Sequence, residues 1–348
     1  MGAGSGAANN LIASLRRAIP SVIAVGCHDD PFVLKKSVAA RNYLLSPSPD
    51  ADEIARIIDK EGVDLVIPIS DAHVVLLSDH RGLLGSHVWL PAKRVIDLCQ
   101  DKYDLAMELA RHDVAVPISL PVTDYEGLDA IVEKLQWSPR LWCRMRSGSR
   151  SLAAVPVNNA QQARAWIDLW QTLHGFDPVS FMLAEYLPGR DYFCQTLWDR
   201  GRLVLVKTGE RISYFGAENS PSSMNSLYSL AKTVDEPGVV ETCVRAVRAL
   251  DASATGAFEF DLKENAAGVP CVTEINIGRL ALGMIVLGRV GAHDMVGCYA
   301  RLGLGWPVES IDNPYDCPPD YYTVRDIDSA AAVFHADDVI DGFLRPGE

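Results

Sequence analysis

Continuous apolar runs and amphipathic segments alternate over the first 95 residues. After a glycine-rich start, apolar residues recur at helical spacing, at Leu11, Ile12, Leu15 and Ile19. Pro20 ends this helix, and the runs 21–26 and 63–69 are almost entirely apolar, as strands buried on both faces are. An amphipathic helix is predicted between them, at 51–61. Strands that alternate with helices predict a parallel sheet with helices on its faces.

Beyond Leu90-Pro91 the pattern changes to helices and to strands joined mostly by turns. Asp101 is expected to cap a helix that runs to about His112, and two more amphipathic helices are predicted at 128–135 and 160–173. Strands are predicted at 141–145, 181–184, 192–197, 203–208, 257–262 and 269–276. This order indicates an α+β region rich in antiparallel strands. The final stretch, 311–348, shows no readable pattern.

Composition and charge narrow the class of protein. The 348 residues are 48% hydrophobic and carry 32 Lys and Arg against 45 Asp and Glu, a net charge of −13. Such a chain is expected to make about two domains, and its negative charge argues against a nucleic-acid partner. We find no apolar run of about 18 residues and no signal-like start, so we expect a cytoplasmic protein without a membrane anchor. The eight cysteines form no Cys-x-x-Cys pair and are expected to be free thiols.

A pair of acidic strands is the sharpest local signal. The segments 258–261 (FEFD) and 271–276 (CVTEIN) flank a predicted four-residue turn at 265–268. Pairing about that turn sets Glu259 opposite Glu274, with Asp261 and Asn276 on the same face. Opposed carboxylates repel each other, and a divalent cation such as magnesium between them would make the interaction favourable. A solvated acidic face is the alternative.

Three further segments are candidates for binding. The strand 141–151 (LWCRMRSGSRS) places Arg144 and Arg146 on one face and runs into small residues, a pattern that suits a phosphate clamp or an exposed basic loop. A strand also runs into the Pro-Gly turn of 185–191 (EYLPGRD). The start Gly2-x-Gly4-x-Gly6 loosely resembles a dinucleotide fingerprint but lacks the preceding strand, so a structural turn is the better interpretation.

Taken in order, these segments resemble an ATP-grasp enzyme over roughly residues 63–304. The ordered set is Asp101-Lys102, 144–150, 185–191, Glu210-Arg211, 259–261 and 274–279. The nearest branch is that of the carbamoyl-phosphate-synthase large chain and related amino-acid ligases. The resemblance implies an α/β and α+β fold: an N-terminal preATP-grasp Rossmann-like domain at 1–95, then a two-lobed ATP-grasp domain. Its small lobe with linker would take 96–182, its large lobe 183–310, and a C-terminal extension 311–348.

The resemblance also implies which residues meet ATP. Lys102 and Arg144 match the two cationic phosphate contacts, Arg being the choice of the carbamoyl-phosphate-synthase branch. Ser147, Gly148 and Ser149 match the loop over the phosphates, with one glycine where the family often has more. The hinge that meets adenine is matched by Glu185, Tyr186 and Leu187. Asp191 stands where an acidic group, more often Glu, holds the ribose.

Metal ligands and catalytic groups follow from the same resemblance. Glu259, Glu274 and Asn276 match the Mg²⁺ ligands, with Mn²⁺ as a substitute, and Arg144, Arg211 and Arg279 match catalytic arginines. The family ending Glu-x-Asn-Pro-Arg is altered here to 274–279, EINIGR, which moves the arginine one place along. We predict that Gly278 bends the strand end and returns Arg279 to the site beside Asn276.

The implied function is an ATP- and Mg²⁺-dependent ligase that joins a carboxylate to an amine through an acyl phosphate. The partners are a small-molecule acid and amine, with no nucleic acid or membrane, and the protein could form a homodimer. Two alternatives stay open: a carbamoyl-phosphate-type phosphorylation or carboxylation enzyme, and a nucleotide-binding ATP-grasp protein without turnover. Residues 216–225 are a candidate lid or a plain surface loop.

Overall fold

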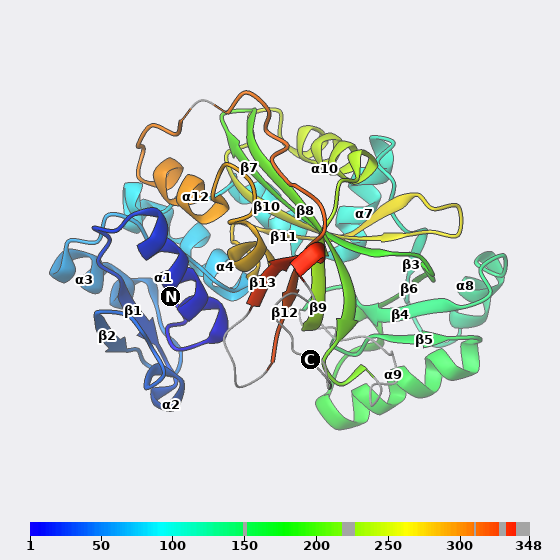
Figure 1. Cartoon of the computed structure of the whole chain (residues 1–348). Coiled ribbons are helices and arrows are strands. Elements are labelled where there is room, and N and C mark those ends of the chain that lie inside the picture. The colour runs from blue at the N-terminus through cyan, green and yellow to red at the C-terminus, as the bar shows by residue number, and fades with distance from the viewer. Residues whose placement is uncertain (149–151, 218–226, 310, 327–331, 339–348) are drawn as a thin grey trace, which may run out of the picture.

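A computed structural model describes residues 1–148, 152–217, 227–309, 311–326 and 332–338. Two antiparallel sheets dominate it, and an N-terminal α/β segment lies on the far side of the larger sheet from the smaller one (Figure 1). None of the helices in the described ranges combines the length and apolar character that crossing a bilayer requires. The architecture is the mixed α/β and α+β arrangement that the sequence predicted.

The larger sheet has seven strands in the order β11-β10-β7-β8-β9-β12-β13, and every neighbouring pair is antiparallel. Its strands are β7 (Asp191–Asp199), β8 (Arg202–Tyr214), β9 (Tyr228–Thr233), β10 (Gly256–Glu264), β11 (Pro270–Ile277), β12 (Tyr321–Val324) and β13 (Ala332–His335). The predicted strands of this region are confirmed: β7, β8 and β10 are longer than predicted, and β11 is displaced by one residue. The sequence pattern missed β9, and also β12 and β13, which extend the sheet beyond it.

The smaller sheet has four strands in the order β3-β6-β4-β5, again antiparallel. These are β3 (Ser119–Pro121), β4 (Leu141–Met145), β5 (Val155–Val157) and β6 (Phe181–Glu185). The helices α8 (Leu128–Lys134) and α9 (Ala160–His174) share a hydrophobic core with it. Because β6 runs to Glu185, a lobe boundary at 182 would cut a strand, and we propose to draw it after Glu185.

The N-terminal region has less sheet than the apolar runs predicted. Only β1 (Val25–His28) and β2 (Arg41–Leu44) pair, in parallel. The strand predicted at 63–69 is wrong: the segment makes a single bridge, between Val66 and Val88, and Pro68 has no N–H to extend it. The strand predicted at 21–26 begins only at Val25.

The other helices of the described residues fall into two groups along the chain. In the first part of the chain they are α1 (Gly6–Ala18), α2 (Pro31–Leu34), α3 (Ala51–Glu61), α4 (Asp71–Asp79), α5 (Arg81–Leu84), α6 (Lys93–Cys99) and α7 (Lys102–Arg111). Later helices are α10 (Pro237–Leu250), α11 (Leu282–Leu287) and α12 (Met295–Gly303). Asp101 caps α7 as predicted, because its carboxylate accepts from the N–H groups of Tyr103 and Asp104.

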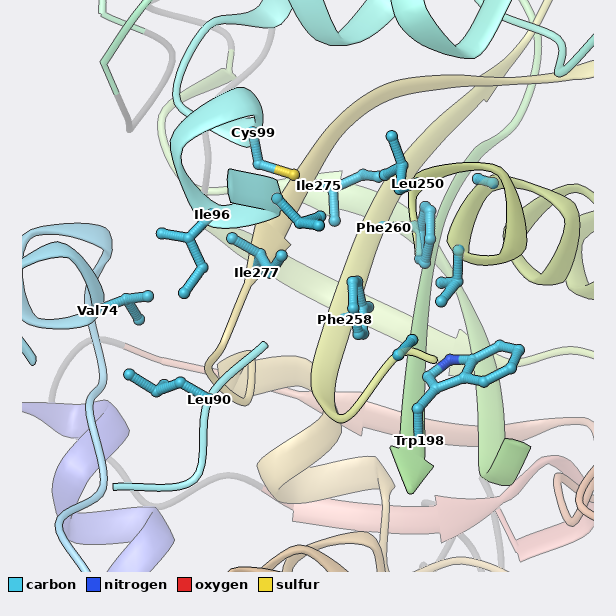
Figure 2. Packing of buried hydrophobic residues seen from close by; sticks show 14 of the residues in the cluster. Val74, Leu90, Ile96, Cys99, Trp198, Leu250, Phe258, Phe260, Ile275 and Ile277 are labelled. Atoms are coloured by element: carbon cyan, nitrogen blue, oxygen red, sulfur yellow. The ribbon is translucent and has the colours of Figure 1, made fainter. Parts of the chain in front are cut away.

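The main core decides which way the acidic strands face. Phe258 and Phe260 of β10 are fully buried and gather with Ile275 and Ile277 of β11 against α6 (Figure 2). Side chains alternate along a strand, so the residues between these apolar positions must point to the opposite face of the sheet. That face carries the acidic side chains of the candidate site.

The glycine-rich start forms a tight turn, as the sequence analysis preferred. Gly2 and Gly4 both have positive φ, and a Cβ on Gly4 would lie 1.9 Å from the Val33 carbonyl oxygen. Backbone conformation and close packing therefore account for glycine at these positions. The eight cysteines are buried free thiols, as expected. Most of the candidate lid at 216–225 lies outside the described residues.

Candidate active site

The acidic hairpin forms, but its register differs from the predicted one. Glu259 pairs with Asn276 and Asp261 pairs with Glu274, two places from the expected pairing. The predicted four-residue turn is a five-residue loop, in which the Asn265 side chain accepts from the N–H groups of Ala267 and Val269. A bulge follows Asp261. Because the shift is even, the four polar side chains still share one face.

Burial raises the pKa of two carboxyl groups on this face. Glu259 is 3% exposed, and burial together with the neighbouring Asp261 raises the pKa of its carboxyl to about 8. Burial also raises the pKa of Glu274, although Lys102 opposes the shift. Asn276 donates to Asp261 over 3.1 Å and so links the two strands. The group therefore attracts positive charge.

Arg279 returns to this group, as predicted. Gly278 has φ of +78° and turns the chain sharply after β11. The Arg279 guanidinium then donates to the Asn276 side-chain oxygen over 2.7 Å and lies 3.7 Å from the Glu259 carboxylate. It also donates to Asp71, the first residue of α4, over 2.7 Å. The one-residue displacement in the sequence is thus compensated by a left-handed glycine.

We predict that Gly278→Ala destabilises the fold by about 1–3 kcal/mol, because a non-glycine residue is strained at this φ and its Cβ would lie 2.9 Å from Val74. Gly62→Ala is the matched control, since Gly62 has φ of +62° with open space around it. Urea unfolding of both variants measures the difference. Equal losses of unfolding free energy in the two would show that the contact with Val74 contributes nothing.

A cleft lies between the two sheets, and two cations enter it. The Lys102 ammonium donates to the Gly148 carbonyl over 2.6 Å and lies 3.3 Å from the Glu274 carboxylate. Arg144 of β4 donates to the Thr273 carbonyl of β11 over 2.8 Å, while its Nε has no protein partner in the described residues. Burial lowers the pKa of Arg144. A buried guanidinium with a free donor is suited to an anionic ligand.

The end of β6 forms the other side of the cleft. Glu185 is buried, and the loss of water raises the pKa of its carboxyl, which accepts from the Ile118 N–H over 3.3 Å. Tyr186 N–H donates to the Ser138 hydroxyl over 3.3 Å, and Leu187 is buried beside it. These residues and Trp142 line the cleft. The side chains of Trp142, Tyr186 and Leu187 offer apolar surface for a flat ring.

Asp191 and Arg211 face each other at the start of β7 and on β8. Arg211 bridges two carboxylates, donating to Asp191 over 2.8 Å and pairing with Asp261. Tyr214 also donates to Asp191. The Arg211 guanidinium lies over the Phe193 ring, 5.1 Å from its centre. Asp191 is therefore held by two donors from β8.

Most of the sequence-predicted residues converge on this single cleft. It is lined by Lys102, Arg144, Ser147, Gly148, Glu185, Tyr186, Leu187, Asp191, Arg211 and Glu274. Asn276 instead lines a second cavity, which shares Lys102, Gly148 and Glu274 with the first. Glu259 and Arg279 lie behind Asn276 and are not among the residues that line either cavity. Ser149 lies outside the described residues.

Comparison with known proteins identifies the fold. No protein-family model and no curated protein matches the sequence. Among solved structures, the biotin carboxylase domain of 2-oxoglutarate carboxylase from Hydrogenobacter thermophilus aligns over 92% of this chain and 71% of its own, with a TM-score of 0.69 and 13% identity. The L-amino acid ligase from Bacillus licheniformis aligns over 92% and 76%, with a TM-score of 0.68 and 14% identity. The chain has the ATP-grasp fold.

A third ATP-grasp structure aligns over a larger share of its own length. Carboxyaminoimidazole ribonucleotide synthase from Aspergillus clavatus, crystallised with ATP, aligns over 93% of this chain and 80% of its own, with a TM-score of 0.65 and 14% identity. At such low identities the likeness concerns the fold. What the cleft can do must come from the residues of this chain.

Sequence reasoning missed several residues of the site. Asp71, the partner of Arg279, is 208 positions away in the sequence and carries no motif. Trp142 and Tyr214 also line the cleft without having been predicted to bind. Trp142 could have been found, because it is two residues from Arg144 and therefore shares the cleft-facing side of β4. Asp71 had no comparable signal.

Proposed function

We propose that the protein is an ATP-dependent ligase that joins a carboxylate to an amine through an acyl phosphate. The observation that carries this proposal is the convergence of Lys102 and Arg144 with Glu274 at one end of a cleft between two sheets. Phosphoryl transfer requires cations around the phosphates and carboxylates for the accompanying metal. The ATP-grasp fold of the solved ligases supports the same assignment.

The nucleotide is oriented by the two ends of the cleft. The ring of ATP would lie against Leu187 and Trp142 at the apolar end, with the backbone of Glu185–Leu187 facing its edge. Its phosphates would extend toward Lys102 and Arg144, whose charges neutralise them. Asp191 also lines the cleft, so its carboxylate could accept a hydrogen bond from a ribose hydroxyl.

The residues of the hairpin fit magnesium by their chemistry. Glu259, Glu274 and Asn276 offer side-chain oxygen ligands, and burial together with the neighbouring Asp261 raises the pKa of both carboxyls. Among the described residues, no three acidic, His or Cys side chains form a preassembled metal site. Arg279 lies 3.7 Å from the Glu259 carboxylate and Lys102 lies 3.3 Å from the Glu274 carboxylate. When bound, Mg²⁺ or its substitute Mn²⁺ would neutralise the phosphates and align them.

The chain's own residues can position both substrates for the reaction. A substrate carboxylate held near Arg279 attacks the γ-phosphorus and displaces ADP, which gives the acyl phosphate. An amine then attacks the acyl carbon, and phosphate leaves with the amine's proton. Arg144 and Arg211 stabilise charge that develops on the transferred group. Positioning and charge stabilisation account for all that the protein must contribute.

Replacing Arg144 by Ala should weaken ATP binding by about 10- to 100-fold, because a charge-assisted bond to phosphate contributes roughly 1.5–3 kcal/mol. Titration calorimetry with ATP and magnesium measures the affinity. Arg111→Ala, on the exposed side of α7, is the matched control and should bind like the unaltered protein. Unchanged affinity in Arg144→Ala would remove Arg144 from the nucleotide site.

The ligase proposal is tested by ADP release from ATP with pooled small acids, with and without pooled amines. We expect that ADP release requires an acid. When an amine is also present, the product should be an amide. An acyl or carbamoyl phosphate as the final product would instead identify a phosphorylating enzyme. ATP binding without ADP release in any pool would identify a non-catalytic protein. Light scattering in the same buffer tests the proposed homodimer.

A further inference from the structure

A second cavity runs along α4 and meets the nucleotide cleft at one end. Its α4 wall includes Asp71, Val75 and Asp79, which are spaced four residues apart, with Leu76 beside them and His80 directly after the helix. Ile275 of β11 lies opposite. The cavity therefore has carboxylates at both ends of the helix and an apolar middle.

The near end of this cavity is the reacting end. Lys102 and Glu274 line both cavities, so a molecule in the second cavity reaches the place where the phosphates of ATP would end. Asp71 lies at this end and holds Arg279 over 2.7 Å. A substrate group placed here would face both the phosphate cations and the arginine.

The far end carries a carboxylate that can accept a new partner. Asp79 is eight residues from Asp71, about 12 Å along the helix axis. Its only ion-pair partner among the described residues is Lys93, whose side chain is half exposed and also pairs with Asp97 over 2.9 Å. Lys93 can stay with Asp97 when another cation binds Asp79. Three carboxylates, the Lys102 ammonium and the His80 imidazole line the cavity, so negative groups predominate and an anionic ligand is disfavoured there.

We propose that this cavity binds the amine substrate and that this amine is an aliphatic diamine or polyamine. The inference rests on the proposed ligase function. One nitrogen lies near Glu274 and Asp71, the methylene chain packs on Val75 and Leu76, and the second ammonium pairs with Asp79. The near ammonium loses one proton to solvent and its nitrogen attacks the acyl carbon. The C–N bond forms as the C–O bond to phosphate breaks, and the second proton leaves on the phosphate.

The first test compares amines in the ADP-release assay with pooled acids. The series consists of α,ω-diamines of increasing chain length, spermidine, and the matching alkyl monoamines. A diamine should have a KM about 10- to 100-fold below that of the monoamine of equal length, because it gains one charge-assisted contact. Asp79→Asn should raise the diamine KM by a similar factor and leave the KM values for monoamine and ATP unchanged. Asp97→Asn, which removes only the other partner of Lys93, is the control.

A binding measurement separates failure of this inference from failure of the ligase proposal. Equilibrium dialysis of radiolabelled 1,5-diaminopentane and spermidine, with a non-hydrolysable ATP analogue present, needs no turnover. Saturable binding that Asp79→Asn weakens about 10-fold supports the diamine site even if no ADP is released. No saturable binding of either amine, or binding and KM values that Asp79→Asn does not change, would overturn it. ADP release with monoamines but not with diamines would support the ligase proposal and contradict the diamine proposal.

Discussion

Glu274→Gln should reduce the rate of ATP turnover about 100-fold or more while the protein stays folded. Glu274 is a partly buried carboxylate on the hairpin face, and it lies 3.3 Å from the Lys102 ammonium. The amide keeps the shape of the side chain but removes the charge that would hold the metal and orient Lys102. Loss of one such preorganised charge costs about 10²–10³ in kcat. Steady-state ADP release at saturating ATP measures the effect.

The control for this variant is Glu133→Gln, on the exposed side of α8, which should turn over ATP normally. Circular dichroism and the thermal midpoint establish that both variants fold. Glu274→Gln is expected to melt no lower than the unaltered protein, because neutralising a partly buried carboxylate relieves its repulsion from Asp261. Full ATP turnover in Glu274→Gln would contradict a metal or phosphate role for this residue.

Arg279→Ala should abolish most turnover, again about 100-fold or more, yet leave ATP binding within about threefold. Arg279 contacts Asn276, Asp71 and Glu259 but lies outside the nucleotide cleft. Its charge should therefore act on the substrate carboxylate and on the acyl phosphate, not on ATP in the ground state. Comparison of kcat with the calorimetric ATP affinity separates an effect on the reaction from an effect on ATP binding.

Arg279→Lys provides the matched variant for this position. It keeps the charge but loses the planar fork that reaches Asp71 and Asn276 together, so an intermediate rate is expected. Removing Arg279 also leaves the buried Glu259 carboxylate with less compensation, which is destabilising in a low-dielectric site. Thermal midpoints must accompany the rates. A normal rate in folded Arg279→Ala would place this arginine outside the mechanism.

The sequence predicted correctly the direction in which the acidic side chains point, but not the residues with which they pair across the strands. Period-two alternation requires Glu259 and Asp261 to oppose Phe258 and Phe260, and the core fixes which side is buried. The register depended on one loop residue. Asn265 accepts from two backbone N–H groups and lengthens the turn, which no spacing argument could distinguish from a four-residue turn.

Other differences arise from contacts between distant segments. In the apolar run 63–69 only Val66 and Pro68 are buried, and the run makes only the bridge from Val66 to Val88, so hydrophobicity alone overstated the sheet. β12 and β13 were missed because short strands at the end of a sheet depend on pairing with β9, not on a strong pattern of their own. Asp71 joins the site only because α4 is packed near the end of β11. By contrast, Gly278 was predictable, since an arginine displaced by one residue needs a left-handed turn to return.

The transfer of labelled oxygen tests the ligase proposal most directly. Pooled small carboxylic acids labelled with ¹⁸O in both carboxylate oxygens would be incubated with ATP, magnesium, and pooled amines that include 1,5-diaminopentane and spermidine. Mass spectrometry of the released phosphate reports whether the carboxylate attacked phosphorus. One ¹⁸O atom per phosphate, with the second retained in an amide product, is the predicted result. Released phosphate without ¹⁸O, or no phosphate release from any pool, would contradict an acyl-phosphate ligase.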